Sequence, residues 1–489
     1  MRKIVIDPVT RLEGHGKIAI FLNDDGEVAN TYFQVPELRG FEQFCVGRPV
    51  EEMPRITTRI CGVCPEAHHM ASTKACDAVF HVEPPPAAKK LRELLYSAFY
   101  VGDHTLHFYA LGGPDFVVGP DAPPGERNIL GVVKKVGLEA GQKVIELRKR
   151  AQRVVSMIGG KAIHPVTGLP GGVAKPLKAE ERDEILGHTT YFLEFAKFTL
   201  GVVDQVVLGN QAYVDMILSD TYTHRVYSMG TVDENNKGNF YDGKIRVVDP
   251  DGKDFVKFSP RDYLQVLAEH VEPWTYLKFP YLKQVGWKGF VDGKDSGVYR
   301  ATPLSRLNAS DGMATPLAQE QYERMYQTLG GKPVHQTLAT HWARVIELVY
   351  AAERAAELAR DEEILSDNIR TIPTATPSEG VGCVEAPRGT LYHHYVTDDR
   401  GILQRVNMIV GTTNNHAPIS MSIRKAAQGL IRRGVEITDG VLNRIEMAFR
   451  AYDPCFGCAT HSLPGKMPLD VQVFDSHGTL LTSRRRGSE

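Results

Sequence analysis

Two pairs of cysteines are the residues of this sequence whose type and spacing could carry chemistry. Cys61 and Cys64 form a CxxC pair near the start of the chain, and Cys455 and Cys458 form a second pair near its end. Thiolates at this spacing bind transition metals or exchange disulfides, and four thiolates around one ion make a common structural zinc site. The pairs alone leave zinc, redox dithiols and coincidence open. A site that used all four cysteines would join the two ends of the fold.

Other polar motifs accompany the two pairs. The first pair lies in Arg59-Ile60-Cys61-Gly62-Val63-Cys64-Pro65-Glu66-Ala67-His68, and the second in Asp453-Pro454-Cys455-Phe456-Gly457-Cys458-Ala459-Thr460-His461. Further motifs are Arg11-Leu12-Glu13-Gly14-His15, Arg39-Gly40-Phe41-Glu42, Asp103-His104-Thr105-Leu106-His107 and Glu385-Ala386-Pro387-Arg388-Gly389. In this order, from residue 7 to residue 461, they resemble the large subunit of a [NiFe]-hydrogenase. The two-sided pattern RxCGxC and DPCxxCxxH makes the resemblance highly specific.

The resemblance implies a nickel–iron centre held by the cysteines. Cys61, Cys64, Cys455 and Cys458 would bind nickel as thiolates, which soft transition metals favour. Cys64 and Cys458 would also bridge to an iron that carries CO and cyanide. Cys455, a terminal ligand, could take up a proton, and Glu13 would relay that proton outward. Outside its motif, Glu13 would more simply be a helix cap or a solvated surface residue.

The resemblance also implies a polar pocket above the metals. Arg388 corresponds to the arginine over the open nickel–iron position, and Asp115 and Asp453 would hold its guanidinium. The alternative for Arg388 is a salt bridge within a loop. Pro387 and Thr412 correspond to the pocket around the diatomic ligands, where a hydroxyl can donate to cyanide.

Further polar residues receive supporting roles by the same resemblance. His68 would donate a hydrogen bond to a bridging thiolate. Glu42, the backbone carbonyl of Met408 and His461 would bind a Mg²⁺ or iron ion, since oxygen ligands suit Mg²⁺. An endopeptidase would cut after His461 once nickel is inserted, so that residues 462–489 form a C-terminal extension that maturation removes.

The implied function is the catalytic subunit of a hydrogenase that oxidises H2 reversibly, starting with heterolytic cleavage. The three remaining cysteines, Cys45, Cys76 and Cys383, are too few for an iron–sulfur cluster, so a separate iron–sulfur small subunit must take the electrons. The sequence is most similar to the cytoplasmic methyl-viologen-reducing type, which works with a heterodisulfide-reductase-like partner. The NAD(P)-linked type, with a diaphorase partner, is the alternative. A zinc-stapled scaffold and a quinone-site subunit of a respiratory complex are weaker alternatives, because the latter family generally lacks both CxxC pairs.

Hydrophobic periodicity indicates the elements that position these residues. Strands are expected at 17–22 and 27–34, joined by the turn Asn23-Asp24-Asp25-Gly26. Helical spacing covers 86–111, 126–158, 179–208 and 317–365, the last interrupted at Gly330 and Pro333. A hairpin is expected at 390–396 and 402–410, helices at 419–434 and 438–450, and another hairpin at 469–474 and 478–481. Residues 230–300 suggest a surface insertion.

These elements predict an α+β fold: a bundle of long helices flanked by small β regions near both termini. Residues 1–461 would form one interlocked domain. The 57 basic and 59 acidic side chains nearly balance, which argues against nucleic-acid binding. No apolar run reaches the ~20 residues of a membrane span, and the N-terminal segment lacks the apolar region of a signal peptide. A cytoplasmic protein is therefore expected.

Overall fold

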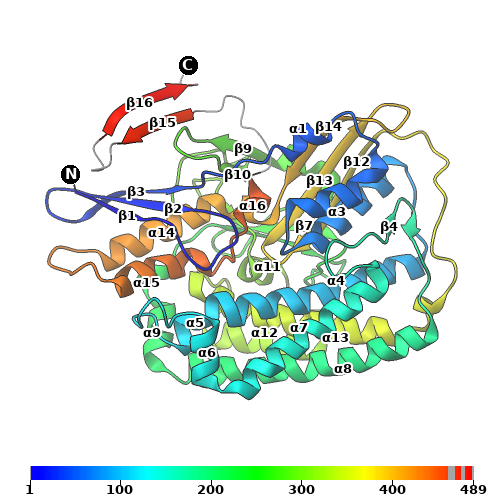
Figure 1. Ribbon diagram of the computed structural model, residues 1–489, viewed down its shortest axis with the longest axis horizontal. Coiled ribbons are helices and arrows are strands. Elements are labelled where there is room, and N and C mark those ends of the chain that lie inside the picture. The colour runs from blue at the N-terminus through cyan, green and yellow to red at the C-terminus, as the bar shows by residue number, and fades with distance from the viewer. Residues whose placement is uncertain (1, 461–468, 475–479, 487–489) are drawn as a thin grey trace.

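The computed structural model describes residues 2–460, 469–474 and 480–486. A layer of long helices forms one side of the molecule (Figure 1). Its members are α4 (Pro86–Leu106), α7 (Leu138–Gly159), α8 (Ala179–Val202), α12 (Pro316–Thr328) and α13 (Thr340–Arg360). The alanine-rich α13 packs against α4, α8 and α12 and is buried along most of its length. Small side chains allow this close approach, and the predicted bundle is confirmed.

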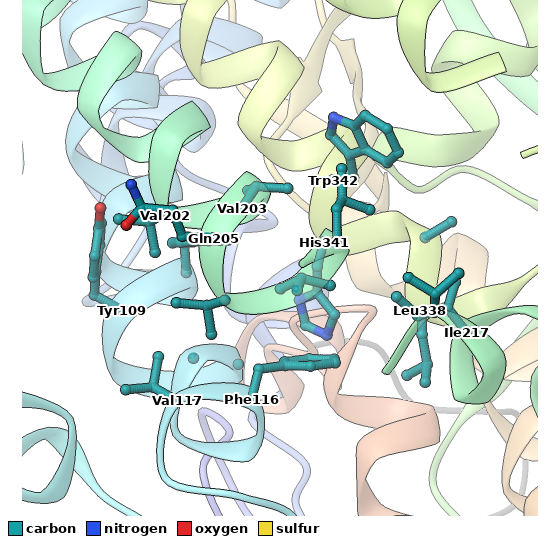
Figure 2. A pocket seen from close by; sticks show the side chains of 18 of the residues that line it. Tyr109, Phe116, Val117, Val202, Val203, Gln205, Ile217, Leu338, His341 and Trp342 are labelled. Carbon is teal, nitrogen blue, oxygen red and sulfur yellow. The ribbon is translucent and has the colours of Figure 1, made fainter. Parts of the chain in front are cut away.

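Two of the predicted helical stretches end in π-helical turns. His107–Gly112 continues α4 into α5 (Gly113–Val117), and Val203–Leu208 continues α8 toward α9 (Gln211–Leu218). The stretch 126–158 is divided into α6 (Ile129–Val136) and α7 by Gly137, whose φ of 93° suits glycine. An apolar cavity of about 270 Å³ lies between the two π-helical turns, and His341 and Phe116 face each other in it (Figure 2).

The N-terminal β region is a three-stranded antiparallel sheet. It consists of β1 (Arg2–Ile6), β2 (Lys17–Leu22) and β3 (Val28–Gln34), with β2 in the middle. The predicted turn closes the β2–β3 hairpin. Buried side chains of the sheet, such as Ile18 and Phe33, share a core with α14 (His416–Leu430) and α15 (Asp439–Arg450). This core holds the N-terminal strands against the two helices that precede the second CxxC pair.

The second β region also has three antiparallel strands, β12 (Glu379–Ala386), β13 (Gly389–Thr397) and β14 (Leu403–Ile409). The hairpin β13–β14 was expected, and β12 was not. Helix α3 (Pro65–Val79), which follows the first CxxC pair, packs directly on β12. A Cβ atom on Gly382 would collide with the Ala71 carbonyl oxygen, so glycine lets the helix backbone touch the strand.

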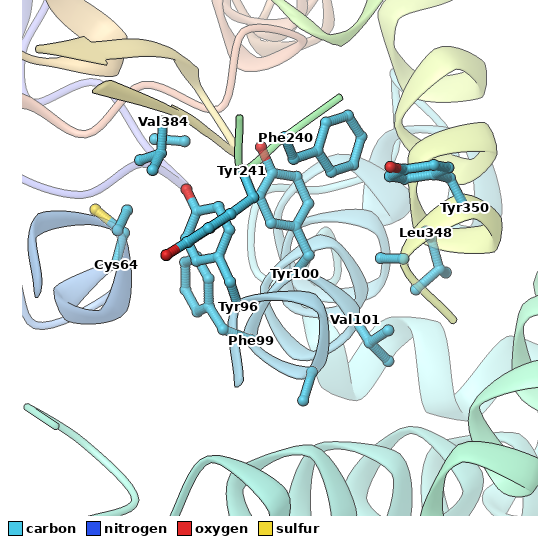
Figure 3. Close-up of a cluster of buried hydrophobic side chains, with 14 of the residues drawn as sticks. Cys64, Tyr96, Phe99, Tyr100, Val101, Phe240, Tyr241, Leu348, Tyr350 and Val384 are labelled. Atoms are coloured by element: carbon cyan, nitrogen blue, oxygen red, sulfur yellow. The ribbon is translucent and has the colours of Figure 1, made fainter. Parts of the chain in front are cut away.

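An aromatic layer fills the space between this sheet and the bundle. Tyr96, Phe99 and Tyr100 of α4 lie beside Phe240, Tyr241 and Tyr350, and Cys64 borders the same cluster (Figure 3). The hydroxyls of Tyr96 and Tyr100 both donate to the Glu385 carbonyl oxygen, at 2.5 and 2.7 Å. The bundle is thereby fastened to the turn that carries Arg388.

The segment 230–300 lies largely in two small sheets. One joins β11 (Tyr299–Arg300), β6 (Tyr227–Val232), β7 (Lys244–Val248) and β8 (Asp254–Phe258); the other pairs β9 (Leu267–Val271) with β10 (Lys278–Leu282). Met229 and Ile245 share a core with Tyr392 and Ile409 of the neighbouring sheet. Thr231 donates from its backbone and its hydroxyl to the Glu385 carboxylate. The segment therefore supports β12 and the Arg388 turn.

The C-terminal hairpin expected from the sequence is present as β15 (Leu469–Phe474) and β16 (Leu480–Arg486), which pair antiparallel. The second strand is longer than predicted. His461 and the residues that join it to β15 lie outside the described ranges. Within those ranges, no helix has both the length and the apolar content required to cross a bilayer.

Candidate metal centre

The first CxxC loop connects a 3₁₀ turn (Thr57–Ile60) to α3. Pro65 occupies the first position of α3, where its missing N–H is not needed. The backbone N–H groups of Val63 and Cys64 donate to Cys61 Sγ at 3.2 and 3.1 Å. Such hydrogen bonds favour the thiolate form of a cysteine.

The second pair follows α15 and opens the short helix α16 (Phe456–Ala459). Cys455 forms a parallel β-bridge with Glu13. The Cys455 N–H donates to Thr412 Oγ1 at 3.1 Å, and the Phe456 N–H donates to the Glu13 carbonyl oxygen at 3.0 Å. The N-terminal loop and the C-terminal cysteines are thus joined through their backbones.

The four cysteine sulfurs form one buried group. They lie within 4.8 Å of one another, with Cys61 Sγ 3.5 Å from Cys455 Sγ and Cys64 Sγ 3.6 Å from Cys458 Sγ. All four thiols are free of disulfides, and none is more than 4% exposed. Four soft donors with converging sulfurs suit nickel and iron as well as zinc. The structure therefore brings together the four residues that were predicted to bind the metals.

Glu13 lies directly beside this group. Its Oε2 atom is 3.0 Å from Cys455 Sγ and accepts the Gly457 N–H at 2.9 Å. Burial raises the pKa of the Glu13 carboxyl above its ordinary value, despite the opposing hydrogen bonds. Gly14 has a φ of 88°, and a Cβ atom there would lie 2.9 Å from the Gly457 nitrogen, so glycine permits the close approach of the two loops.

Arg388 occupies the turn between β12 and β13 and is buried. Both of its Nη atoms donate to Asp103 Oδ1 at 3.2 Å, and Nη2 lies 2.9 Å from Asp453 Oδ2. Arg344 of α13 also approaches Asp453, at 3.6 Å. The predicted partner Asp453 is in place, and Asp103 and Arg344 are additional members of the network.

The predicted pairing of Asp115 with Arg388 is wrong. Asp115 binds Arg11 and Arg450 instead, with contacts of 2.5 and 2.7 Å. The π-helical turn between α4 and α5 explains the difference, because its wider spiral changes which side of the chain faces the metal centre. Asp103 precedes this turn and faces the centre, whereas Asp115 follows it.

The other predicted pocket residues lie close by. Thr412 receives the Cys455 N–H, and the Pro387 carbonyl accepts from Arg306 Nη2 at 3.1 Å. His68, on α3 after Cys64, is fully buried, and its Nδ1 lies 3.1 Å from His393 Nε2. His393 in turn contacts the Tyr395 hydroxyl at 2.6 Å. This chain of contacts fixes the ring of His68.

Arg39 holds the two cysteine loops together. Its Nη2 donates to the carbonyl oxygens of Ile60 and Gly457, which adjoin the first and second pairs respectively. The Arg39 N–H donates to the Thr460 carbonyl oxygen at 2.9 Å. The sequence showed Arg39 only as part of a motif, because its role depends on residues 60 and 457 lying side by side in the fold.

The residues of the second predicted metal site are partly brought together. The Met408 N–H donates to Glu42 Oε1 at 2.7 Å, which joins α1 (Phe41–Cys45) to β14. His461, the third predicted ligand, lies outside the described residues.

Comparisons with known proteins agree with this geometry. The family model described as "Nickel-dependent hydrogenase" matches residues 39–122 and 293–461, and the model "HoxL-like" matches residues 3–38. The chain is 50% identical over 485 residues to the F420-non-reducing hydrogenase iron-sulfur subunit of Archaeoglobus profundus, covering 99% of this chain and 100% of that protein. It is 39% identical to the NAD-reducing hydrogenase HoxS subunit beta of Cupriavidus necator, with 99% and 100% covered.

A solved structure gives the same result. An NAD⁺-reducing [NiFe]-hydrogenase in the H2-reduced state superposes with a TM-score of 0.88 at 36% identity, covering 94% of this chain and 100% of that one. The α+β fold, the buried four-cysteine group and these full-length similarities lead to one conclusion. The chain belongs to the nickel-dependent hydrogenase family, as a large, catalytic subunit similar to those of the F420-non-reducing hydrogenases.

Proposed function

We propose that the four cysteines hold a nickel–iron centre whose iron carries CO and cyanide. The observation that supports this most directly is the buried group of four sulfurs, with the Glu13 carboxylate 3.0 Å from one of them. When bound, the metals supply the site at which H2 is split heterolytically. A structural zinc site would need only the sulfurs, whereas this group also has a carboxylate and a buried arginine aimed at it.

Glu13 is the proton carrier in this proposal. Cys455 Sγ holds the proton that leaves H2, and Glu13 Oε2 accepts it across a distance suitable for direct transfer. The raised pKa of Glu13 allows the carboxyl to hold a proton near neutral pH and to release it outward. His15 is exposed and lies two residues further along, so the relay begins close to the surface.

Arg388 shapes the pocket above the metals. Asp103 and Asp453 bind its guanidinium from two sides, so its direction is fixed before a substrate arrives. Asn415 supports the same turn, since its side chain donates to the Arg388 carbonyl oxygen at 2.7 Å. Thr412 and Pro387 would border the diatomic ligands, and His68 would donate to a bridging thiolate.

Electrons leave through a separate iron–sulfur small subunit in this proposal. Among the described residues, the four cysteines are the one cluster of three or more potential metal ligands. Cys45, Cys76 and Cys383 are dispersed and buried, and burial raises the pKa of each thiol, to about 11 for Cys45. They therefore behave as inert thiols and provide no cluster site.

The finer assignments rest on the family similarity. A Mg²⁺ or Fe²⁺ ion would bind Glu42, the Met408 carbonyl and His461 in a protein that works in the cytoplasm. A heterodisulfide-reductase-like subunit is the favoured electron acceptor, because identity is higher to the F420-non-reducing relative. A diaphorase of the NAD-linked type is the alternative that the HoxS similarity supports. A maturation endopeptidase would remove residues 462–489.

Infrared spectroscopy of the purified complex, together with metal analysis, tests the proposed centre. Bands from CO and cyanide, with one nickel per chain, are the expected result. Zinc without nickel, and no such bands, would refute the nickel–iron assignment. Intact-mass measurement on the same sample tests removal of the tail, and a full-length active chain would refute it.

A further inference from the structure

A buried ionic cluster connects the loop that carries Glu13 to the helix that leads to Cys455. Arg11, Asp115, Asn443, Glu446 and Arg450 form this group, which is called the Asp115 cluster below. Asp115, Asn443, Glu446 and Arg450 are each at most 5% exposed. Two arginines face two carboxylates, so the charges balance inside the protein.

Asp115 is the member that contacts both sides. Its Oδ1 accepts from Arg11 Nη2 at 2.5 Å, and its Oδ2 accepts from Arg450 Nη1 at 2.7 Å. Burial opposes ionisation of this carboxyl, but the charges of Arg450 and Arg11 hold the pKa of Asp115 below its ordinary value. Arg11 precedes Glu13 by two positions, and Arg450 precedes Cys455 by five.

The other members strengthen the same connection. Thr10 donates from its N–H and its hydroxyl to the two Glu446 oxygens, each at 2.9 Å, and Glu446 Oε2 also accepts from Arg450 at 2.7 Å. Asn443 accepts from Arg11 at 2.9 Å and donates to Asp115 at 3.1 Å. Residues 10 and 11 are therefore fixed to α15 by side chains, just as residue 13 is fixed to residue 455 by backbone.

Two strained residues lie between these attachments. Arg11 has a φ of 57° and Asp453 a φ of 54°, both in the left-handed region that non-glycine residues seldom adopt. Such conformations persist only where the surroundings hold them. If Asp115 released its two arginines, both segments could relax, and the Glu13 carboxylate would move relative to Cys455 Sγ.

Helix α5 can resist this relaxation because its other side is anchored. Phe116, next to Asp115, packs edge-on against His341 at 5.5 Å and against Tyr213 at 5.4 Å (Figure 2). His341 stacks in turn on His107, whose Nε2 donates to the Arg450 carbonyl oxygen. The carboxylate of Asp115 is therefore presented from a fixed support.

We propose that Asp115 is a positioning residue for proton transfer, and that it sets the distance between Cys455 Sγ and Glu13 Oε2 from outside the metal centre. This inference rests on the proposed role of Glu13 as the proton carrier. Asp115 itself touches neither the cysteines nor Glu13 in the described structure, so its effect must pass through the two backbone segments.

The test compares Asp115→Asn with Asp121→Asn in the complete hydrogenase complex. Asp121 is a suitable control because it also pairs with an arginine of α15, Arg444, but at an exposed position. In Asp115→Asn we expect about 10-fold to 100-fold slower H2 oxidation with a viologen dye, as small misplacements produce. The solvent deuterium isotope effect should rise while the CO and cyanide infrared bands stay unchanged. Asp121→Asn should match the wild type.

Hydrogen exchange of the metal-free protein provides a readout that does not depend on activity. The amides of Phe456 and Gly457, which donate to Glu13, should exchange faster in Asp115→Asn and at the wild-type rate in Asp121→Asn. Asp115→Glu keeps the charge and should recover part of the lost turnover. If Asp115→Asn does not assemble, the double variant Arg11→Gln and Asp115→Asn removes one charge of each sign and should assemble while remaining slow.

The inference is overturned if the assembled single or double variant keeps both the wild-type isotope effect and the wild-type exchange of these amides. It is also overturned if the infrared bands change, because Asp115 would then act on the metals. Failure of the Glu13 proposal is distinguishable, since Glu13→Gln would then retain full activity whatever Asp115 does.

Discussion

The position of Glu13 depends on two short segments of backbone that run side by side. The bridge between residues 13 and 455 fixes the main chain, and the Gly457 N–H directs one carboxylate oxygen toward the Cys455 sulfur. A carboxylate so placed can accept a proton without moving, because donor and acceptor are already in contact. Its burial also removes competing water, and this is the cause of its raised pKa.

Replacement of Glu13 by glutamine is therefore expected to block proton exit. The amide has nearly the same shape but cannot accept the proton from Cys455. Turnover of H2 oxidation should fall by about 10²-fold or more, within the usual range for a general acid–base residue. Nickel content and the CO and cyanide bands should be preserved. Glu27→Gln, at an exposed turn, serves as the control, and a Glu13→Gln enzyme with wild-type turnover contradicts the proposal.

Individual site residues were predictable to different degrees. The cysteines, Glu13, Arg388 and Asp453 belong to short motifs, so local sequence was sufficient to find them. Asp103 and Asp115 are both acids near the end of the same predicted helix, and only the π-helical turn between them decides which one meets Arg388. Arg39 acts through backbone carbonyls, which have no sequence signature.

Among the elements, α3 and β12 are unusually close, and the first cysteine loop depends on their contact. A side chain at Gly382 would meet the backbone of Ala71 and Ala75. Gly382→Ala should therefore displace α3, lower the free energy of unfolding by about 1–3 kcal/mol and reduce nickel uptake. Gly187→Ala, in open space on α8, should be neutral or slightly stabilising. Equal denaturation midpoints for the two variants would show that the backbone contact is not limiting.

A buried ion network joins helix α13 to the Arg388 turn. Glu347 of α13 binds Arg306 of α11 (Pro303–Ala309) through two contacts of 2.6 Å and His104 of α4 at 2.9 Å. Burial opposes its ionisation, but the charge of Arg306 and these hydrogen bonds lower the pKa of Glu347 to about 2. Arg306 also donates to the carbonyl oxygens of Ala386 and Pro387.

Because this pKa lies below the ordinary value of 4.5, ionised Glu347 stabilises the fold above that pH, and its contribution is lost as the pH falls from about 4.5 to 2. Glu347→Gln should lower stability by about 3–5 kcal/mol near neutral pH, since it leaves Arg306 partly unpaired. The difference in melting temperature between wild type and variant should shrink as the pH falls through this window. A difference independent of pH would contradict the ionic explanation.

On the scale of the whole molecule, periodicity and turn residues predicted the helix bundle, the N-terminal hairpin and the β13–β14 hairpin. They could not predict β12, because Glu379–Ala386 contains two glycines and its strand form depends on α3. Nor could they show how 230–300 supports the Arg388 turn, since that support comes from Thr231 bonded to Glu385, far away in sequence. Local patterns fail where a distant element determines the conformation.

The metal centre itself joins the first and last quarters of the chain, so metal loading is expected to stabilise the whole molecule. In the unfolded chain the two CxxC pairs are far apart, and a metal that needs all four sulfurs binds only the folded form. A ligand at a thousandfold excess over its dissociation constant adds about 4 kcal/mol to stability. A chain that ends at His461, prepared with and without the metals, should therefore melt at a clearly higher temperature when loaded. Cys64→Ser should abolish this difference, and Cys76→Ser, at a buried thiol outside the centre, should keep it. Equal melting temperatures for the loaded and metal-free chains would mean that the two ends are already held together by the β-bridge and the Asp115 cluster alone.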